Sequence, residues 1–224
     1  RYSKMADSAT KLYYFTANGA ADPIRFLLFQ NGVEFEDIRF TREEWPKVKE
    51  ELGAECTFGQ VPLLKYEGKT FVQTRAILYY LGAKFGIIPQ GAEEEFNTSW
   101  YLDVKEDMLQ SVTKGFHGSE EEKKVAQEKL LTTDLPLFLK GMEEKFNADG
   151  VTDRGYLVTD KPSLADFAII CFLENLFYHS VRKERYSPVL VANAPNIAAW
   201  LDKKLEEFNG YFTSKYRPPT TSGQ

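Results

Sequence analysis

The stretch from residue 58 to residue 76 constrains the fold of this chain most strongly. It contains two short apolar runs, at 61–66 and 70–72, which are joined by a two-residue turn that includes Gly68. Strand-forming residues on both sides of such a turn predict a β-hairpin. Pro62 lies at the entrance of the first run, and proline belongs at the start of a strand or on a sheet edge because it lacks an N–H.

The second run of this hairpin passes directly into Gln73 and Thr74 and then into a helical pattern that extends to about Phe85. Thr74 is a favourable N-cap residue, so the helix is predicted to follow it. The unpaired N–H groups of a helix N-terminus suit an anion such as a carboxylate. On its own, however, this stretch predicts no more than a hairpin followed by a capped helix.

Strand and helix patterns alternate only in the first part of the chain. Residues 11–16 and 33–40 read as strands, and a helix is expected after each, the first with Asp22 as its cap and Pro23 at its start. After Gly86 no convincing strand remains. The pattern predicts an α/β domain followed by an all-α domain. The expected segments are a loose N-terminal segment 1–10, an α/β domain 11–86, a linker 87–92, a helical domain 93–217 and a disordered tail 218–224.

Several helix boundaries in the chain carry capping signals. Thr41 and Glu44, Ser119 and Glu122, and Ser163 and Asp166 have the spacing of a capping box. Pro136 is expected to kink or break the long helix that starts after Ser119 and runs to about residue 147. The helix predicted over residues 164–179 is apolar nearly all round and should form the buried centre of the helical domain. Pro195 starts the last predicted helix.

Composition excludes several classes of function. The net charge is −5 and no cluster of Lys and Arg stands out, so neither nucleic acid nor an anionic membrane is an expected partner. No apolar run is long enough to span a bilayer. Cys56 and Cys171 are far apart, which argues against a disulfide scaffold or a zinc site and favours a reducing, cytoplasmic location. With only His117 and His179, a histidine-based metal site or triad is not expected.

A set of short motifs resembles one known family. The matching segments are 11–15 (KLYYF), 23–25 (PIR), the run around 44–49, 58–62 (FGQVP), 72–81 (VQTRAILYYL) and 163–166 (SLAD). In this order they resemble a cytosolic glutathione transferase of the sigma class, the group that includes glutathione-dependent prostaglandin D synthase and the S-crystallins. The resemblance implies a thioredoxin-like N-terminal domain, a helical C-terminal domain, a two-fold homodimer and a cis bond before Pro62.

The chemistry of such a protein needs a group that ionises a thiol. The glutathione thiol has a pKa near ~8.5, and a hydroxyl that donates a hydrogen bond to the sulfur lowers it. Tyr13 and Tyr14 are adjacent, and strand alternation sends them to opposite faces, so only one can serve. Periodicity does not choose between them. The resemblance implies Tyr14, the Tyr directly before Phe15, as the catalytic residue.

The resemblance also implies the residues that hold the remainder of glutathione. The backbone of Val61, next to Pro62, would pair with the cysteinyl backbone as an added strand. Gln73 and Thr74 would hold the γ-glutamyl carboxylate, and Trp45 and Lys49 the glycine end, with Gln60 close to that end. The glutathione-binding residues expected are Tyr14, Trp45, Lys49, Gln60, Val61, Pro62, Gln73, Thr74 and Asp107.

Three carboxylates, Asp103, Glu106 and Asp107, share one face of a predicted helix. By themselves they read as a solvated face. The resemblance implies that Asp107 reaches the glutamyl amine of glutathione across the dimer interface. Prostaglandin D synthase also holds a divalent cation among matching acids, but Glu106 replaces an Asp here, and no metal is expected.

The resemblance leaves three functions open. The first is conjugation of glutathione to small hydrophobic electrophiles, whose pocket would include Phe15, Met108 and Val112. The second is a glutathione-dependent isomerase such as a prostaglandin D synthase. The third is a non-catalytic, crystallin-like binding protein. One departure concerns the active site, because Ala20 stands where sigma-class members usually carry an Arg near the catalytic Tyr.

Overall fold

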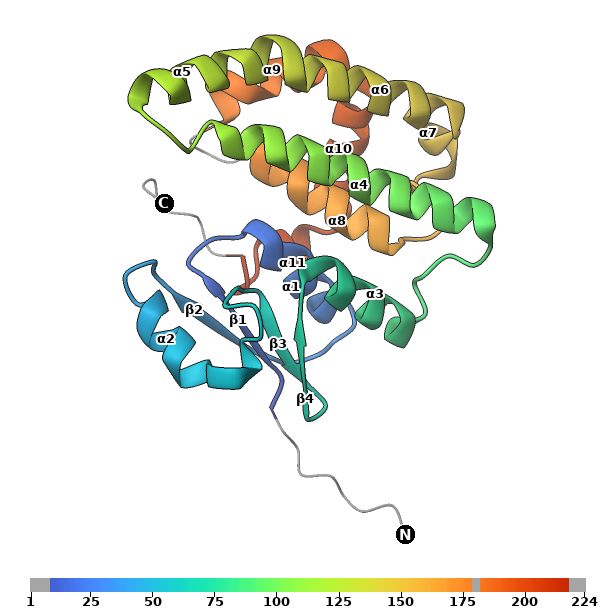
Figure 1. Ribbon diagram of the computed structural model, residues 1–224. Coiled ribbons are helices and arrows are strands. Elements are labelled where there is room, and N and C mark those ends of the chain that lie inside the picture. The colour runs from blue at the N-terminus through green and yellow to red at the C-terminus, as the bar shows by residue number, and fades with distance from the viewer. Residues whose placement is uncertain (1–8, 179–181, 218–224) are drawn as a thin grey trace. The chain divides into compact units, whose positions relative to one another are not determined.

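The computed structural model describes residues 9–178 and 182–217 (Figure 1). Within this range the chain forms two compact units. The first comprises residues 9–86 and 209–217, and the second is Ile87–Phe208. The segment 209–217 therefore belongs to the first unit, whereas the sequence pattern placed it in the helical domain. The tail 218–224 and most of the segment 1–10 lie outside the described residues.

The first unit is built on a mixed four-stranded sheet in the order β2-β1-β3-β4. Its strands are β1 (Lys11–Phe15), β2 (Glu36–Phe40), β3 (Leu63–Tyr66) and β4 (Lys69–Val72). β1 runs parallel to β2 and antiparallel to β3. The predicted hairpin is confirmed, and its turn residues Glu67 and Gly68 both have positive φ, as a two-residue turn between twisted strands requires. The predicted second strand begins three residues late, at Glu36.

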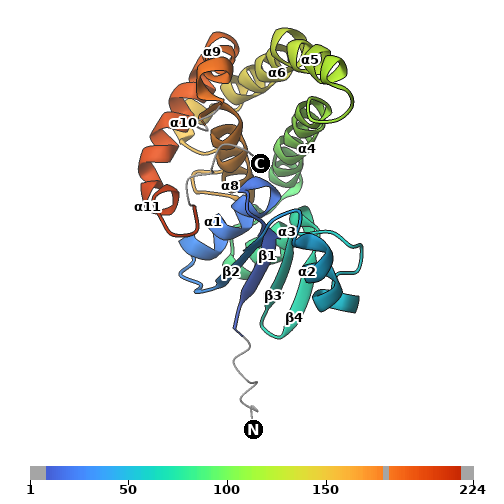
Figure 2. The same cartoon turned by 90° about the vertical axis from the view of Figure 1, so that its left-hand side faces the viewer.

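Helices cover both faces of this sheet. They are α1 (Asp22–Gln30), α2 (Trp45–Leu52), α3 (Thr74–Phe85) and the short α11 (Asn209–Phe212), with 3-10 turns η1 (Gly19–Ala21) and η2 (Gly53–Glu55). α2 lies against the face that carries Tyr13 and Leu63, and α1 and α3 pack together on the other face, where Leu12 and Leu64 are completely buried (Figure 2). Strand alternation thus separates two apolar layers.

Two predicted N-caps are wrong by one residue. Ala21 and not Asp22 is the N-cap of α1, and Asp22 is its first helical residue. Gln73 and not Thr74 is the N-cap of α3. The Asp22 side chain does not cap the helix: it is completely buried and accepts a hydrogen bond from the Tyr211 hydroxyl. Thr41 and Glu44 do exchange the two hydrogen bonds of a capping box, but α2 begins only at Trp45, with Glu44 as its N-cap.

The second unit contains no strand in its described residues. Its elements are α4 (Ala92–Lys114), α5 (Glu120–Lys129), the π-helical η3 (Leu130–Asp134), α6 (Leu135–Ala148), α7 (Val151–Arg154), α8 (Leu164–Leu173), the π-helical η4 (Glu174–Tyr178), α9 (Lys183–Asn193) and α10 (Pro195–Glu207). α8 is buried at nearly every position and contacts α4 and α10, as its all-round apolar sequence predicts.

The capping boxes of this unit are confirmed and explain where two of its helices begin. Ser119 and Glu122 cap α5 reciprocally. The carboxylate of Asp166 accepts hydrogen bonds from the N–H of Ser163 at 2.8 Å and from its hydroxyl at 2.7 Å, at the start of α8. Pro136 follows the π-helical turn η3, which is the predicted local break.

Two expectations for this unit differ from the structure. The helix predicted over 164–179 changes to a π-helical turn at Glu174, and His179 lies outside the described residues. The pattern did not predict α9, because Pro188 within it is a helix breaker in most contexts.

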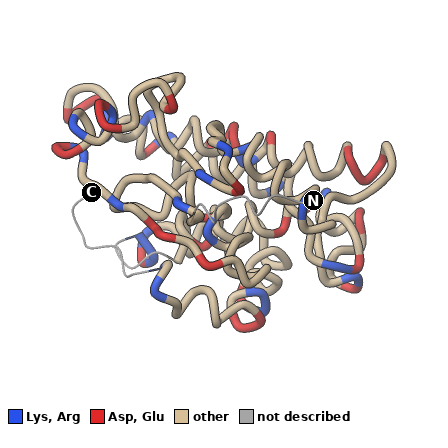
Figure 3. The backbone as a smooth tube through the Cα atoms, turned by 90° about the horizontal axis from the view of Figure 1, so that it is seen from below, with Lys and Arg blue, Asp and Glu red and all other residues tan. Residues whose placement is uncertain are grey.

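Acidic and basic residues are interspersed along the chain (Figure 3). Many form pairs, for example Lys145 with Asp149 and Lys65 with Glu55. Among the described helices, none has both the length and the apolar character that crossing a membrane requires.

Candidate active site

Tyr14 lies near the end of β1, half-buried, with its hydroxyl next to the turn η1. The backbone N–H of Ala20 donates a hydrogen bond of 3.1 Å to the Tyr14 hydroxyl oxygen. Tyr13 is on the other face of the sheet, where it packs against the buried cluster of Leu52, Cys56 and Leu63. The two adjacent tyrosines therefore have different environments, and the oxygen of Tyr14 already accepts one hydrogen bond while its own proton remains available for donation.

Gly19 allows this close approach of the turn to the tyrosine. Its φ is +44°, and a Cβ at this position would lie 2.7 Å from the Tyr14 hydroxyl oxygen. Any larger residue would have to move the ring or the turn. In the sequence, Asn18 followed by Gly19 indicates only a turn, so this contact with the tyrosine could not be predicted from it.

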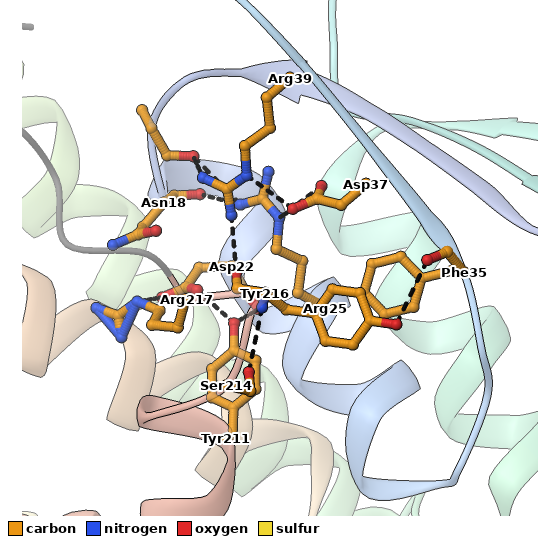
Figure 4. A network of polar contacts seen from close by, with 11 residues as sticks. Asn18, Asp22, Arg25, Phe35, Asp37, Arg39, Tyr211, Ser214, Tyr216 and Arg217 are labelled. Atoms are coloured by element: carbon orange, nitrogen blue, oxygen red, sulfur yellow. Dashed lines mark hydrogen bonds and ion pairs between the residues drawn. The ribbon is translucent and has the colours of Figure 1, made fainter.

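A cation lies close to Tyr14 although Ala20 supplies none. The guanidinium carbon of Arg25 is 5.8 Å from the centre of the Tyr14 ring, and the Arg25 side chain is completely buried. Its Nε donates to both carboxylate oxygens of Asp37, at 2.9 and 3.0 Å. Arg39 also donates to Asp37, at 2.7 Å (Figure 4). Two guanidinium groups thus share one carboxylate, and burial together with the positive charge of Arg25 lowers the pKa of Arg39.

A groove lies beside this turn, within the first unit. It is lined by Ala20, Phe58, Gln60, Val61, Pro62, Val72, Gln73 and Thr74. Five of the predicted glutathione-binding residues therefore come together from two separate segments. Ala20 connects the groove to Tyr14, because it both lines the groove and bonds the tyrosine hydroxyl.

The segment before β3 forms one wall of the groove. The peptide bond between Val61 and Pro62 is cis, as the resemblance implied. Val61 precedes β3 and is half-buried, and Pro62 is buried. Phe58 lines the same groove although it is 64% exposed, and its sequence pattern gave no sign of this position.

The start of α3 forms another wall. Gln73 has φ +73° and ψ 109°, a conformation that is uncommon for a residue with a side chain, and residues held in such conformations cluster at functional sites. Thr74 is the first residue of α3, so the unpaired N–H groups of the first helical turn face the same region. This arrangement suits the carboxylate of a bound ligand.

Trp45 and Lys49 lie on α2. The Trp45 ring stacks on Phe40 at 5.5 Å and meets Phe15 edge-on at 5.8 Å, so it anchors α2 to the sheet. The Lys49 side chain runs across Gly59, where a Cβ would lie 2.6 Å from Nζ. Its ammonium thus reaches the loop that carries Gln60. It forms no ion pair with another residue in the part of the chain that the structure describes.

The remaining predicted residues are outside this groove. Phe15 is half-buried between Tyr14, Phe40 and Trp45. In the helical unit, Asp107 is exposed on α4, whereas Met108 is completely buried and Val112 is 7% exposed. Their roles stay predictions. Nowhere in residues 9–178 and 182–217 do three or more His, Cys, Asp or Glu side chains gather in a group that could hold a metal ion.

Comparisons with known proteins match both halves of the chain. Residues 9–83 match the family described as "Glutathione S-transferase, N-terminal domain", and residues 106–204 match "Glutathione S-transferase, C-terminal domain". Glutathione S-transferase 3 of Caenorhabditis elegans is 32% identical over 210 residues, which cover 88% of this chain and 97% of the relative.

Solved structures agree with this match. Prostaglandin synthase D of Nilaparvata lugens has a TM-score of 0.77 and 30% identity, covering 92% of this chain and 98% of the other. Na-GST-3 of Necator americanus, described as a monomeric glutathione S-transferase, has a TM-score of 0.74 and 27% identity, covering 96% of this chain and all of the other. The chain therefore belongs to the glutathione S-transferase family and is a transferase that uses glutathione as its co-substrate.

Proposed function

We propose that Tyr14 is the catalytic residue of this transferase. Its hydroxyl would donate a hydrogen bond to the sulfur of glutathione and lower the thiol pKa, since hydrogen bonding to the charged form favours that form. The observation that carries the proposal is the Ala20 N–H bond to the Tyr14 oxygen at the edge of the groove. The Ala20 N–H donates to the Tyr14 oxygen and polarises the phenol. The proton of the Tyr14 hydroxyl then remains available for a hydrogen bond to the sulfur.

The groove supports a placement for the rest of glutathione. The backbone of Val61 would pair with the cysteinyl residue as an added strand, with Pro62 fixing the edge. Gln73 and Thr74 would bind the γ-glutamyl carboxylate at the start of α3. Lys49 would meet the glycine carboxylate, with Gln60 and Trp45 beside it. The ammonium of Lys49, which forms no ion pair within the described residues, lies next to Gly59 and supports this assignment.

The reacting partner would be a small hydrophobic electrophile. The glutathione thiol releases its proton to solvent, and the resulting thiolate, stabilised by the Tyr14 hydroxyl, attacks the electrophilic carbon. In a chlorodinitrobenzene-type substrate the carbon–sulfur bond forms as the carbon–chlorine bond breaks, and chloride leaves with the bonding electrons. We assign Phe15, Met108 and Val112 to the pocket for this partner. Glutathione is consumed in this reaction.

An isomerase of the prostaglandin D synthase type is the second candidate. It is favoured by the likeness to prostaglandin synthase D of Nilaparvata lugens and by the sigma-class motifs of the sequence. Such an enzyme would use the same thiolate but regenerate glutathione. Measuring glutathione consumption during turnover separates the two candidates.

We further propose that the chain works as a homodimer in which Asp107 binds the glutamyl amine of the partner's glutathione. The exposure of Asp107 on α4 supports this role. Na-GST-3 is described as monomeric, so the assembly has to be measured. A monomer at working concentration, or an Asp107→Ala variant with unchanged affinity for glutathione, would remove the basis for it. Cys56 and Cys171 are both free and buried, which supports a reducing, cytoplasmic location.

The experiment for the proposed function compares Tyr14→Phe with the wild type. The loss of one hydrogen bond to a charged sulfur should cost a factor of roughly 10 to 100 in turnover of a chlorodinitrobenzene-type substrate. Affinity for glutathione should stay within about twofold, because the groove is intact. Turnover equal to that of the wild type would refute the role of Tyr14.

A further inference from the structure

The C-terminal segment of the described chain, residues 209–217, packs onto the first unit through aromatic stacking. The Tyr211 ring stacks on Phe26 of α1 at 4.4 Å and an interplanar angle of 9°, and Tyr211 is completely buried. The Tyr216 ring stacks on Phe35 at 4.1 Å. We call residues 209–217 the C-terminal clasp. Because close-packed side chains move little, the clasp can keep the residues that it contacts in place.

The clasp holds Asp22 directly. The single proton of the Tyr211 hydroxyl is shared between Asp22 Oδ1, at 2.5 Å, and the Asp22 carbonyl oxygen, at 3.1 Å. Arg217 Nε lies 3.3 Å from Asp22 Oδ2, and both side chains are buried. The N–H of Asp22 in turn bonds the carbonyl of Gly19. Asp22 is therefore the last residue of the turn 17–22, whose Ala20 bonds Tyr14. The clasp holds this end of the turn in place.

A second route fixes the start of the same turn. The Tyr216 carbonyl accepts a hydrogen bond of 2.7 Å from Arg39 Nη2. Arg39 and Arg25 both donate to Asp37. Arg25 Nη1 then donates to the carbonyl oxygens of residues 17 and 18, at 3.2 and 3.1 Å (Figure 4). Residues 17–22 are thus held at both ends by groups connected to the clasp.

The middle of this turn touches only Tyr14 among the candidate catalytic groups. Ala20 donates to the Tyr14 hydroxyl, and Gly19 lies so close that a Cβ would clash with it. The position of the hydroxyl oxygen therefore follows the position of the turn. Hydrogen-bond strength falls steeply with distance and angle, and small misplacements of reacting groups are costly.

We propose that the C-terminal clasp, through Tyr211 and through the Tyr216 carbonyl, is a positioning element for the Tyr14 hydroxyl. This inference rests on the role of Tyr14 proposed above. The clasp touches neither glutathione nor the reacting atoms in this account. It acts through the turn of residues 17–22, and it is supplied by a segment that lies some 190 residues further along the chain.

The test is the Tyr211→Phe variant. The ring and its stacking on Phe26 remain, and only the hydroxyl that holds Asp22 is lost. The expected result is a fall in kcat of roughly 5- to 10-fold with KM for glutathione unchanged within twofold. The pH midpoint of the glutathione thiolate absorbance should also move toward that of the free thiol. A clasp with a merely structural role would move neither kcat nor this midpoint.

Tyr156→Phe is the matched control. The Tyr156 hydroxyl donates to Glu207 at 2.5 Å in the helical unit, so this variant loses a hydrogen bond of the same kind and length. Because the Tyr156 bond is exposed and the Tyr211 bond is buried, its thermal stability should fall less, while its thiolate midpoint and kcat stay at the wild-type values. If Tyr211→Phe and Tyr156→Phe change kcat and the midpoint equally, the clasp has no positioning role.

Arg39→Lys tests the second route and serves if Tyr211→Phe does not fold. It keeps the charge but cannot bond both Asp37 and the Tyr216 carbonyl as the guanidinium does. The same loss of kcat and the same midpoint shift are expected. Wild-type values in a folded Tyr211→Phe, or in Arg39→Lys if only that variant folds, overturn the proposal. If instead Tyr14→Phe retains full turnover, it is the catalytic role of Tyr14 that fails, and the two failures are distinguishable.

Discussion

The backbone N–H of Ala20 lies 3.1 Å from the hydroxyl oxygen of Tyr14 and donates a hydrogen bond to it. Through this contact, the turn of residues 17–22 determines where the Tyr14 hydroxyl lies. Ala20 stands where sigma-class members usually carry an Arg, but here it is the backbone of this residue, and not its side chain, that contacts the tyrosine. The cation near the ring comes from Arg25, 5.8 Å from its centre.

Gly19→Ala should reduce turnover strongly. The new methyl group would lie 2.7 Å from the Tyr14 oxygen, so either the ring or the turn must move. Gly32→Ala is the matched control, because Gly32 also has positive φ, at +66°, but has no atom within 4 Å of the added Cβ. The control should lose about 1 to 2 kcal/mol of stability and keep its kcat. Steady-state kinetics and urea unfolding of both variants check this, and equal kcat values would contradict the close approach.

Lys49→Gln should weaken glutathione binding by about 10-fold at low salt. The ammonium has no acidic partner in the described chain, so it is available for a carboxylate of the ligand. Titration calorimetry at two salt concentrations should show the difference shrinking at high salt. Lys47→Gln is the control, since Lys47 is on the same helix with a side chain 83% exposed. Equal affinities of the two variants would place the glycine carboxylate elsewhere.

Ala20→Arg should lower the thiol midpoint of bound glutathione further. An added positive charge favours the thiolate, so the thiol pKa of bound glutathione should shift to lower pH. Arg25 and Arg39 share the single carboxylate of Asp37, so a net positive charge already lies near Tyr14. The added Arg should therefore shift the midpoint by less than about one pH unit. The readout is thiolate absorbance against pH. A midpoint that rises would mean that the new side chain displaces the turn.

Asp166→Ala should destabilise the protein by about 3 kcal/mol. The Asp166 carboxylate is completely buried and accepts hydrogen bonds from Ser163 and from the N–H of Leu157 at 2.8 Å, and alanine leaves these donors buried without a partner. Equilibrium urea unfolding measures the loss. Less than about 1 kcal/mol would mean that water replaces the carboxylate.

Local sequence signals predicted most of the first unit. The hairpin, the capping box at Thr41 and the helix after Gln73 each arise from residues within a few positions of one another, so pattern alone specified them. The adjacent Tyr13 and Tyr14 were predicted to face opposite ways, and they do. The choice between them needed the family resemblance, because both faces of a covered sheet accept an aromatic ring.

Long-range pairing could not be predicted from the sequence. Asp22 looks like an ordinary helix cap, and only the fold shows that its partner is Tyr211, far along the chain. The same holds for Arg39 and the Tyr216 carbonyl. A buried polar pair of this kind leaves no periodic trace, because each member sits in a segment whose local pattern is already explained.

The central claim is that Tyr14 lowers the thiol pKa of bound glutathione. The most direct measurement is thiolate absorbance against pH for glutathione bound to the wild type, Tyr14→Phe and Tyr13→Phe. The account predicts a wild-type midpoint clearly below the ~8.5 of a free thiol, an unchanged midpoint in Tyr13→Phe, and a return toward the free value in Tyr14→Phe. Equal midpoints in the wild type and Tyr14→Phe, or a return to the free value only in Tyr13→Phe, would contradict it.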